Sequence, residues 1–316
     1  MEVTIIIPTY KRLHYLSQAI ESVIQQTYKN WTCLIINDYP PEGKAIASLL
    51  EEINDSRLIL IDRERSQGGN AARNTGIKLA KADIIAFLDD DDLWLPNKLE
   101  KHLERHQQNP EAGLIYSGVK QCWDEESLPS KITEVTLPEG EIIEAMRQGI
   151  FCPHSTSGVT VRRQCFEQCG MFDENLVSFQ DWDMWFRIAQ SYSFDCVNSA
   201  LIIFRQHLGD RTSQSVQRRL QGLEQIISKW NPKLVNPQQF RNIFTKEVYI
   251  THTNKLILQK NYKEAFTYWQ KLLKISNTKK DLLQATKLAI LFLFGSNLYQ
   301  PVINSYRYLI LNKKPQ

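Results

Sequence analysis

The sequence predicts an α/β protein with a doubly wound, mostly parallel sheet and an α-helical C-terminal extension. Residues 1–118 alternate strand-like apolar runs with segments whose apolar residues recur at helical spacing. The first run, VTIIIP at residues 3–8, is apolar nearly throughout, as in a strand covered on both faces. The alternation stops near residue 118, and the chain is helical in pattern from about residue 214.

The elements follow in a regular order. In the first part we expect strands at 3–8, 31–38, 57–62, 83–88 and 112–118, with helices around 16–24, 45–53, 70–82 and 97–109. In the second we expect a strand at 157–163, an amphipathic helix at 181–190 and one or two strands within 193–207. We therefore divide the chain into residues 1–213 (halves 1–118 and 119–213) and residues 214–316.

The composition is that of an ordinary soluble globular protein. Of 316 residues, 42% are hydrophobic and 23% charged, and the net charge of +3 argues against a nucleic-acid binder. We expect no signal peptide, because Met1 leads directly into VTIIIP. The six cysteines form no Cys-x-x-Cys pair, which favours free thiols over zinc. These features predict a cytoplasmic protein.

Polar segments follow each of the first four expected strands. They read PTYKR (8–12), NDYPP (37–41), DRERSQGG (62–69) and DDDD (89–92). The carboxyl ends of parallel strands meet at one edge, where doubly wound sheets bind ligands. We therefore expect these four segments to line one site.

The four aspartates at 89–92 need a compensating charge. Mg²⁺ and Mn²⁺ prefer oxygen ligands and often take one or two carboxylates together with phosphate oxygens. In an extended segment, Asp89 and Asp91 would face one side and Asp90 and Asp92 the other. The alternative is an acidic turn or helix cap before Pro96.

Four segments together resemble an inverting glycosyltransferase of family 2 with the GT-A fold. They are TIIIPTYKR, QTYKNWTCLIIND, GGNAARNTGIKLAKADIIAFLDDDDLWLPNKLEKH and FQDWDMWFRIA, and the resemblance covers roughly residues 3–207. It implies a nucleotide-diphospho-sugar donor, a divalent metal (Mn²⁺ or Mg²⁺) and a single displacement that inverts the anomeric centre.

The resemblance assigns donor contacts to the first two strand ends. Pro8, Thr9 and Tyr10 would hold the base and ribose, and Asp38 would contact the base. The family's usual Asp-Asp-Gly-Ser here reads NDYP at residues 37–40. A UDP-sugar is the expected donor, but this departure leaves the base open.

The resemblance also assigns the metal and phosphate contacts. Asp91 would bind the metal directly, while Asp89 and Asp90 would serve the ribose and the groups around the metal. Arg73, at an expected helix start after two glycines, would contact a phosphate. The alternative for Arg73 is a surface side chain.

The FQDWDMWFRIA segment would supply the catalytic base. Asp181 holds the position of the family's catalytic aspartate, although the usual preceding Glu is Gln180. Asp183 lies about 200° further around a helix and cannot act from the same face. Arg205 and His207 match an Arg-x-His that would approach the pyrophosphate or the metal.

The expected function is transfer of a sugar to a hydroxyl of a glycan or lipid-linked glycan. The alternatives are a non-catalytic sugar-nucleotide-binding or glycan-binding protein that keeps the fold, and a sugar nucleotidyltransferase. A dehydrogenase is disfavoured, because no Gly-x-Gly-x-x-Gly follows the first strand. KLAILFLF (287–294), flanked by lysines, permits membrane-surface contact, and helix-bundle core is the alternative.

Overall fold

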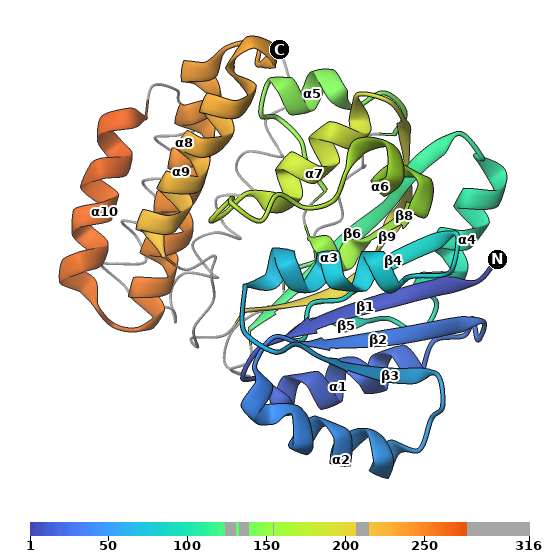
Figure 1. Cartoon of the computed structure of the whole chain (residues 1–316). Helices are drawn as coiled ribbons and strands as arrows, with labels where there is room; N and C mark the ends of the chain where they lie inside the picture. Colours follow the sequence, from blue (N-terminus) through green and yellow to red (C-terminus); the bar gives the residue numbers. More distant parts are fainter. Residues whose placement is uncertain (124–130, 133–138, 154, 207–214, 277–316) are drawn as a thin grey trace, which may run out of the picture. The chain divides into compact units, whose positions relative to one another are not determined.

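The computed structural model describes residues 1–123, 131–132, 139–153, 155–206 and 215–276. The chain forms two compact units, Met1–His207 and Leu208–Gln316 (Figure 1). Each unit is described by itself below.

The first unit contains one mixed sheet. Within the described residues it has nine strands in the order β3-β2-β1-β4-β8-β6-β9-β5, with β7 paired to β6. The strands are β1 (Val3–Thr9), β2 (Trp31–Asn37), β3 (Leu58–Asp62), β4 (Ile84–Phe87), β5 (Leu93–Trp94), β6 (Ala112–Trp123), β7 (Lys131–Ile132), β8 (Val159–Arg162) and β9 (Ser193–Gln206). The helices are α1 (Leu13–Ile24), α2 (Gly43–Ile53), α3 (Gly69–Leu79), α4 (Lys98–Gln108), α5 (Ile143–Arg147), α6 (Arg163–Cys169) and α7 (Gln180–Ala189), with 3₁₀ turns η1 (Pro40–Glu42) and η2 (Thr156–Gly158).

The predicted doubly wound α/β arrangement is confirmed. Strands β3, β2, β1 and β4 are all parallel, because each is joined to the next by a helix that crosses over the sheet. Beyond β4 the pairs are antiparallel except for β6 with β9. The expected one or two strands in 193–207 are a single strand, β9, which pairs with β6 through register shifts.

The strand register brings the predicted segments to one edge. Thr9, at the end of β1, is level with Asn37 on β2, and Asn37 is level with Asp62 on β3. The Asn37 side chain donates to Asp62 Oδ1 over 2.7 Å. The polar segments after these strands therefore begin at the same edge, as the sequence predicts.

Strand β1 is buried along its whole length, so helices must cover both of its faces. On one face, side chains of β1 pack with α1 and α4 in a core that includes Ile5, Leu16 and Leu99. On the other face α3 lies close against β1, because a Cβ at Gly76 would stand 2.6 Å from Ile6 Cγ2. The site at the end of β1 is thus mounted on a rigid strand.

Aromatic side chains fill the space between the sheet and α6 and α7. Phe87 at the end of β4 contacts Phe166, Phe172 and Trp185, with ring centroids 5.9, 5.6 and 6.4 Å away. The tryptophans of α7 are buried, as expected for core residues. This packing holds α7 against the end of β4.

The second unit is helical over its described residues. It contains α8 (Val216–Trp230), η4 (Asn231–Lys233), α9 (Pro237–Leu258) and α10 (Tyr262–Ile275). Its core includes Val216, Val248 and Leu272. Among the described helices, none is both long and apolar enough to cross a bilayer. The KLAILFLF segment lies outside the described residues.

A basic cluster is buried between α4 and the sheet. The hydroxyl of Thr160 lies 3.1 Å from Nδ1 of His102 and 3.0 Å from Nε2 of His106. Lys98, on the same face of α4, is completely buried, and its Nζ lies 4.0 Å from the Trp94 ring centroid. Burial, followed by the nearby charges of Arg162 and Lys98, lowers the pKa of His106 to about 3.

We expect His106 to make the protein sensitive to mild acid. Its pKa is lower in the folded than in the unfolded chain (about 6.5), so its contribution to stability is present above pH 6.5 and is lost as pH falls toward 3. The loss is at most about 1.4 kcal/mol per pH unit for this group. His106→Gln should flatten the fall in urea midpoint between pH 7 and 5.

The matched control is His14→Gln, because His14 is exposed on α1. It should leave the pH dependence of the midpoint as in the parent protein. Equal slopes for the parent and His106→Gln would show that His106 is not the group responsible.

Candidate active site

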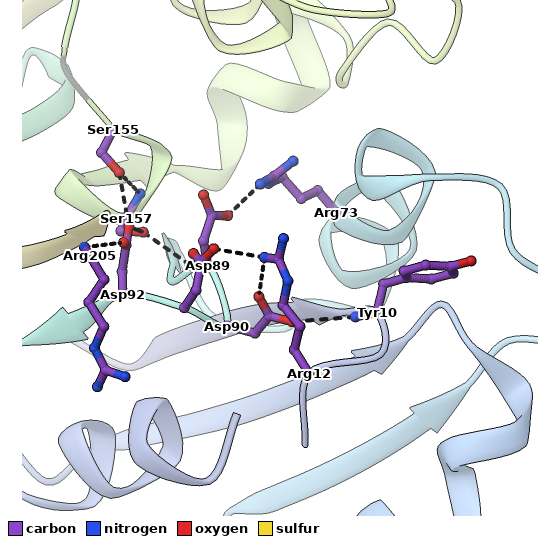
Figure 2. A network of polar contacts seen from close by, with 10 residues as sticks. Tyr10, Arg12, Arg73, Asp89, Asp90, Asp92, Ser155, Ser157 and Arg205 are labelled. Carbon is purple, nitrogen blue, oxygen red and sulfur yellow. Dashed lines mark hydrogen bonds and ion pairs between the residues drawn. The ribbon is translucent and has the colours of Figure 1, made fainter. Parts of the chain in front are cut away.

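The four aspartates form a turn and are not extended. The amide of Asp92 donates to the carbonyl of Asp89 over 3.0 Å, which closes the turn directly after β4. The expected alternation of faces is therefore wrong, because it assumed that the strand continues through residue 92. Each aspartate instead has its own surroundings (Figure 2).

Asp89 pairs with Arg73 of α3. The Arg73 side chain is 9% exposed and the Asp89 side chain 28%. The turn into α3 is made possible by Gly68, whose φ of 89° is open to glycine and strained for other residues. The structure thus places Arg73 beside the acidic turn, and the surface alternative is wrong.

Arg12 lies against Asp90 and Asp91. Its Nη1 is 3.2 Å from Asp90 Oδ1 and 2.7 Å from Asp91 Oδ2. Both carboxylates are buried. Burial, followed by the charge of the neighbouring Asp91, raises the pKa of Asp90 to about 7, although the charge of Arg12 lowers it. Negative charge is thus concentrated at this point.

Asp92 is directed into the protein. Its Oδ2 accepts from the hydroxyl of Ser157 over 2.6 Å, and its Oδ1 accepts from the amide of Arg205 over 3.3 Å. The side chain of Arg205 points away from the acidic turn (Figure 2). Its guanidinium lies over the ring of Tyr15, 5.5 Å from the centroid. Arg205 therefore reaches the turn with its backbone only.

Asp38 anchors the loop that precedes α3. Its carboxylate pairs with Arg63 and accepts from the hydroxyl of Ser66 over 2.9 Å. It also accepts from the amides of Gln67 over 3.1 Å and Gly68 over 2.8 Å. Both oxygens of Asp38 are engaged by this loop.

The PTYKR segment (8–12), which begins within β1, carries both buried and exposed side chains. Pro8 and Thr9 are buried in β1. Tyr10 is 45% exposed, and its ring lies 5.3 Å from that of Tyr39. Nζ of Lys11 stands 4.5 Å from the Tyr39 centroid, and the φ of Lys11 is 57°, a left-handed value that is uncommon outside glycine.

The two aspartates of α7 have different surroundings. Asp183 is completely buried, and its Oδ2 accepts from Nε of Arg187 over 3.0 Å. Arg187 also donates to the carbonyl of Met171 over 2.6 Å, so this pair joins α7 to the loop before it. Burial raises the pKa of Asp181, while the charge of Arg73 lowers it and that of Asp89 raises it. Asp181 thus lies close enough to Arg73 and Asp89 for their charges to act on it.

Two asparagines of α3 hold the loop that leads to α7. The Asn74 side chain donates to the carbonyl of Phe172 and accepts from its amide, over 2.9 Å each. Asn70 donates to the carbonyls of Asp173 and Leu176, over 2.9 and 3.3 Å. Helix α3 therefore fixes the loop before Asp181 as well as presenting Arg73.

The sequence predicted that the aspartates, Arg73 and Asp181 belong to one site, but it did not predict the residues that bind these side chains. Arg12 lay within the PTYKR segment, and Arg63 lay in the DRERSQGG segment, so position alone could have indicated both. Ser157 lies 65 residues after Asp92 and gives no sequence signal. His207, the second predicted metal ligand, lies outside the described residues.

An acidic turn at the carboxyl edge of a doubly wound sheet is the arrangement that the resemblance to GT-A glycosyltransferases predicts. The glycosyl transferase family 2 model matches residues 4–170, more than half of the chain. The chain belongs to this family and is a glycosyltransferase. A Methanocaldococcus jannaschii uncharacterised glycosyltransferase is 32% identical over 208 residues, which are 64% of this chain and 70% of the relative.

Relatives with named activities include proteins of cell-surface glycan synthesis. One is the Escherichia coli UDP-Glc:alpha-D-GlcNAc-diphosphoundecaprenol beta-1,3-glucosyltransferase WfgD, 41% identical over 107 residues. That match covers 34% of this chain and less than half (42%) of WfgD. The putative colanic acid glycosyl transferase WcaA of E. coli is 27% identical over 77% of this chain and 86% of its own.

Solved structures confirm the GT-A fold. S. aureus TarS 1–349 in complex with UDP-GlcNAc matches with a TM-score of 0.57 and 15% identity, over 98% of this chain and 92% of TarS 1–349. The Pyrobaculum calidifontis mannosyltransferase PcManGT, in complex with GDP-Man and Mn²⁺, matches with a TM-score of 0.57 and 17% identity, over 99% and 88% of the two chains.

The two aspartates of α7 should differ in their effect on stability. Asp183→Asn leaves Arg187 without its buried charged partner, which costs about 3–5 kcal/mol. Asp181→Asn removes a carboxylate whose charged form is disfavoured by burial, so the free energy of unfolding should not fall. Urea denaturation of both variants at pH 7.5 measures this difference, and equal losses would contradict it.

Proposed function

We propose that this glycosyltransferase moves a sugar from a nucleotide-diphospho-sugar, with inversion and metal assistance, to a hydroxyl of a glycan or lipid-linked glycan. The observation that carries the proposal is the pair of buried carboxylates, Asp90 and Asp91, at the strand edge, together with the separate carboxylate of Asp181, which the charges of Arg73 and Asp89 reach. A UDP-sugar is the donor we propose first.

The residues at the acidic turn fit a divalent cation. Asp90 and Asp91 offer hard oxygen donors, and both lie against one nitrogen of a single guanidinium, that of Arg12. We assign the direct metal contact to Asp91, with His207 as a second proposed ligand. When bound, Mn²⁺ or Mg²⁺ would supply positive charge beside the diphosphate of the leaving group.

The other donor contacts follow the strand edge. Pro8, Thr9 and Tyr10 form the proposed wall for the base and ribose, and the ring of Tyr39 extends it. Arg73, with Asp89, is proposed for the phosphate and ribose. Because both oxygens of Asp38 bind its own loop, we assign Asp38 to shaping the base site through that loop.

Asp181 is the proposed general base. It would accept the proton of the acceptor hydroxyl as the oxygen bonds to the anomeric carbon and the bond from that carbon to the diphosphate breaks. Attack from the side opposite the leaving group inverts the anomeric centre. Asp183 is unsuited to this role, because it is buried and paired with Arg187.

Two further assignments rest on the relatives. The printed names of WfgD and WcaA support a lipid-linked or polysaccharide acceptor, and PcManGT, bound to GDP-Man and Mn²⁺, supports a metal-assisted sugar-nucleotide reaction. We assign donor binding and transfer to residues 1–213, and contact with the acceptor or with a membrane surface to residues 214–316. We place the protein in the cytoplasm or at the cytoplasmic face of the membrane.

Substitutions of Asp91 and Asp181 should impair the enzyme in different ways. Asp91→Ala should abolish metal-dependent donor binding. Asp181→Asn should keep donor binding and lower turnover by about 10²–10⁴-fold, the range of a general base. Calorimetric titration with nucleoside diphosphates and Mn²⁺, together with nucleoside diphosphate release from a panel of donors, measures both.

Asp83→Asn is the matched control, because the side chain of Asp83 is 85% exposed. It should leave binding and release unchanged. Normal turnover of Asp181→Asn would disprove the base assignment, and donor binding by Asp91→Ala with undiminished metal dependence would disprove the metal assignment.

Activity should fall in acid at a higher pH than for an ordinary aspartate. The base must be a carboxylate, and burial raises the pKa of Asp181 above its usual value of about 3.9. As pH falls through this raised pKa, turnover should decline about tenfold per unit. The pH profile of metal-dependent donor hydrolysis at saturating donor and Mn²⁺ measures it, and a flat profile down to pH 4 would contradict it.

A further inference from the structure

One hydroxyl joins both ends of the acidic turn. The Oγ of Ser157 accepts from the amide of Asp89 over 3.0 Å and donates to Oδ2 of Asp92 over 2.6 Å (Figure 2). Ser157 is completely buried. The hydrogen bond from the Asp92 amide to the Asp89 carbonyl links the same two ends of the turn a second time.

Ser157 is itself held from several directions. Its carbonyl accepts from Nε1 of the buried Trp94 over 2.9 Å, and its amide donates to Oγ of Ser155 over 3.1 Å. It lies in η2, directly before β8, which pairs with β4. The hydroxyl is thus fixed relative to the strand from which the acidic turn emerges.

These contacts affect Asp90 and Asp91, which lie between the two ends of the turn. Ser157 binds both ends of the turn, and between these ends the carboxylates of Asp90 and Asp91 both contact the guanidinium of Arg12. Ligands fixed beforehand bind a cation more tightly than ligands that must be ordered on binding.

We propose that Ser157 is a positioning residue for the cation and donor site, acting by holding Asp90 and Asp91 in their binding conformation. Ser157 does not touch the cation or the substrate. The inference rests on the proposed function, because it requires that the acidic turn binds a divalent cation with the nucleotide.

The test is Mn²⁺ affinity in the presence of UDP, measured from the electron paramagnetic resonance signal of free Mn²⁺ and without turnover. Ser157→Ala should raise the Kd for Mn²⁺ about 10- to 100-fold, the effect typical of groups that orient metal ligands. Ser157→Cys keeps the side-chain size with a weaker hydrogen bond, should weaken binding similarly, and serves if the alanine variant does not fold.

Ser22→Ala is the matched control. Ser22 is also buried, and its Oγ accepts from the amide of Trp94 over 3.2 Å, beside the turn but without contact to an aspartate. It should lower the urea midpoint as a lost buried hydroxyl does while leaving Mn²⁺ affinity unchanged. A merely structural role for Ser157 predicts the same result for Ser157→Ala.

A double-mutant cycle locates the effect. Asp92→Ala and Ser157→Ala remove the acceptor and the donor of one hydrogen bond, so their effects on the Kd for Mn²⁺ should not multiply. Unchanged affinity in both Ser157 variants, or fully multiplicative effects, would overturn the proposal. Failure of the parent protein to bind Mn²⁺ with UDP would overturn the proposed function and this inference together, whereas binding by the parent with equal binding by the variants overturns this inference alone.

Discussion

The site depends on the compensation of four adjacent carboxylates at the end of a buried strand. Like charges this close repel one another, and burial makes each charge more costly. The fold meets this constraint by giving each aspartate a partner from a different part of the chain: Arg73 of α3 for Asp89, Arg12 for Asp90 and Asp91, and Ser157 for Asp92. The turn is therefore a meeting point of segments far apart in sequence.

In this arrangement, the residues that support the site differ from the residue that is exposed at its edge. The aspartates and Arg73 are held by buried contacts, whereas Tyr10 at the same edge is nearly half exposed. Asp38 belongs to the support, because its two oxygens fix the loop that leads into α3. The exposed group at this edge thus stands on a frame whose aspartates are all bound by other parts of the chain.

The fold and the location of the site could be predicted because both depend on local patterns. Continuous apolar runs identify strands covered on both faces, and parallel strands bring their carboxyl ends to one edge. Helical spacing also separated Asp181 from Asp183, and the four-residue spacing of Asp183 and Arg187 is that of an ion pair on one helix face. All of these features depend on residues that are close together in the sequence.

The contacts that shape the site could not be predicted in this way. Residues 89–92 turn, and both ends of the turn bind the hydroxyl of Ser157, which lies far along the chain and in no recognisable motif. The direction of the Arg205 side chain follows from its packing over Tyr15, although its place in the chain suggested the pyrophosphate. Long-range partners of this kind are fixed by tertiary packing.

The bond pair between Asn74 and Phe172 has a consequence for chimeric enzymes. Asn74 binds the backbone of residue 172 through one amide and one carbonyl, as a neighbouring strand would, and its side-chain amide also donates to the carboxylate of Glu174 over 2.8 Å. Grafting the acceptor half of a relative onto residues 1–118 therefore places no demand on the side chain at position 172, whereas position 174 should keep a side chain that accepts a hydrogen bond. The grafted loop must also keep its length and its path along α3, so loop length together with the residue at position 174 should decide which halves can be exchanged.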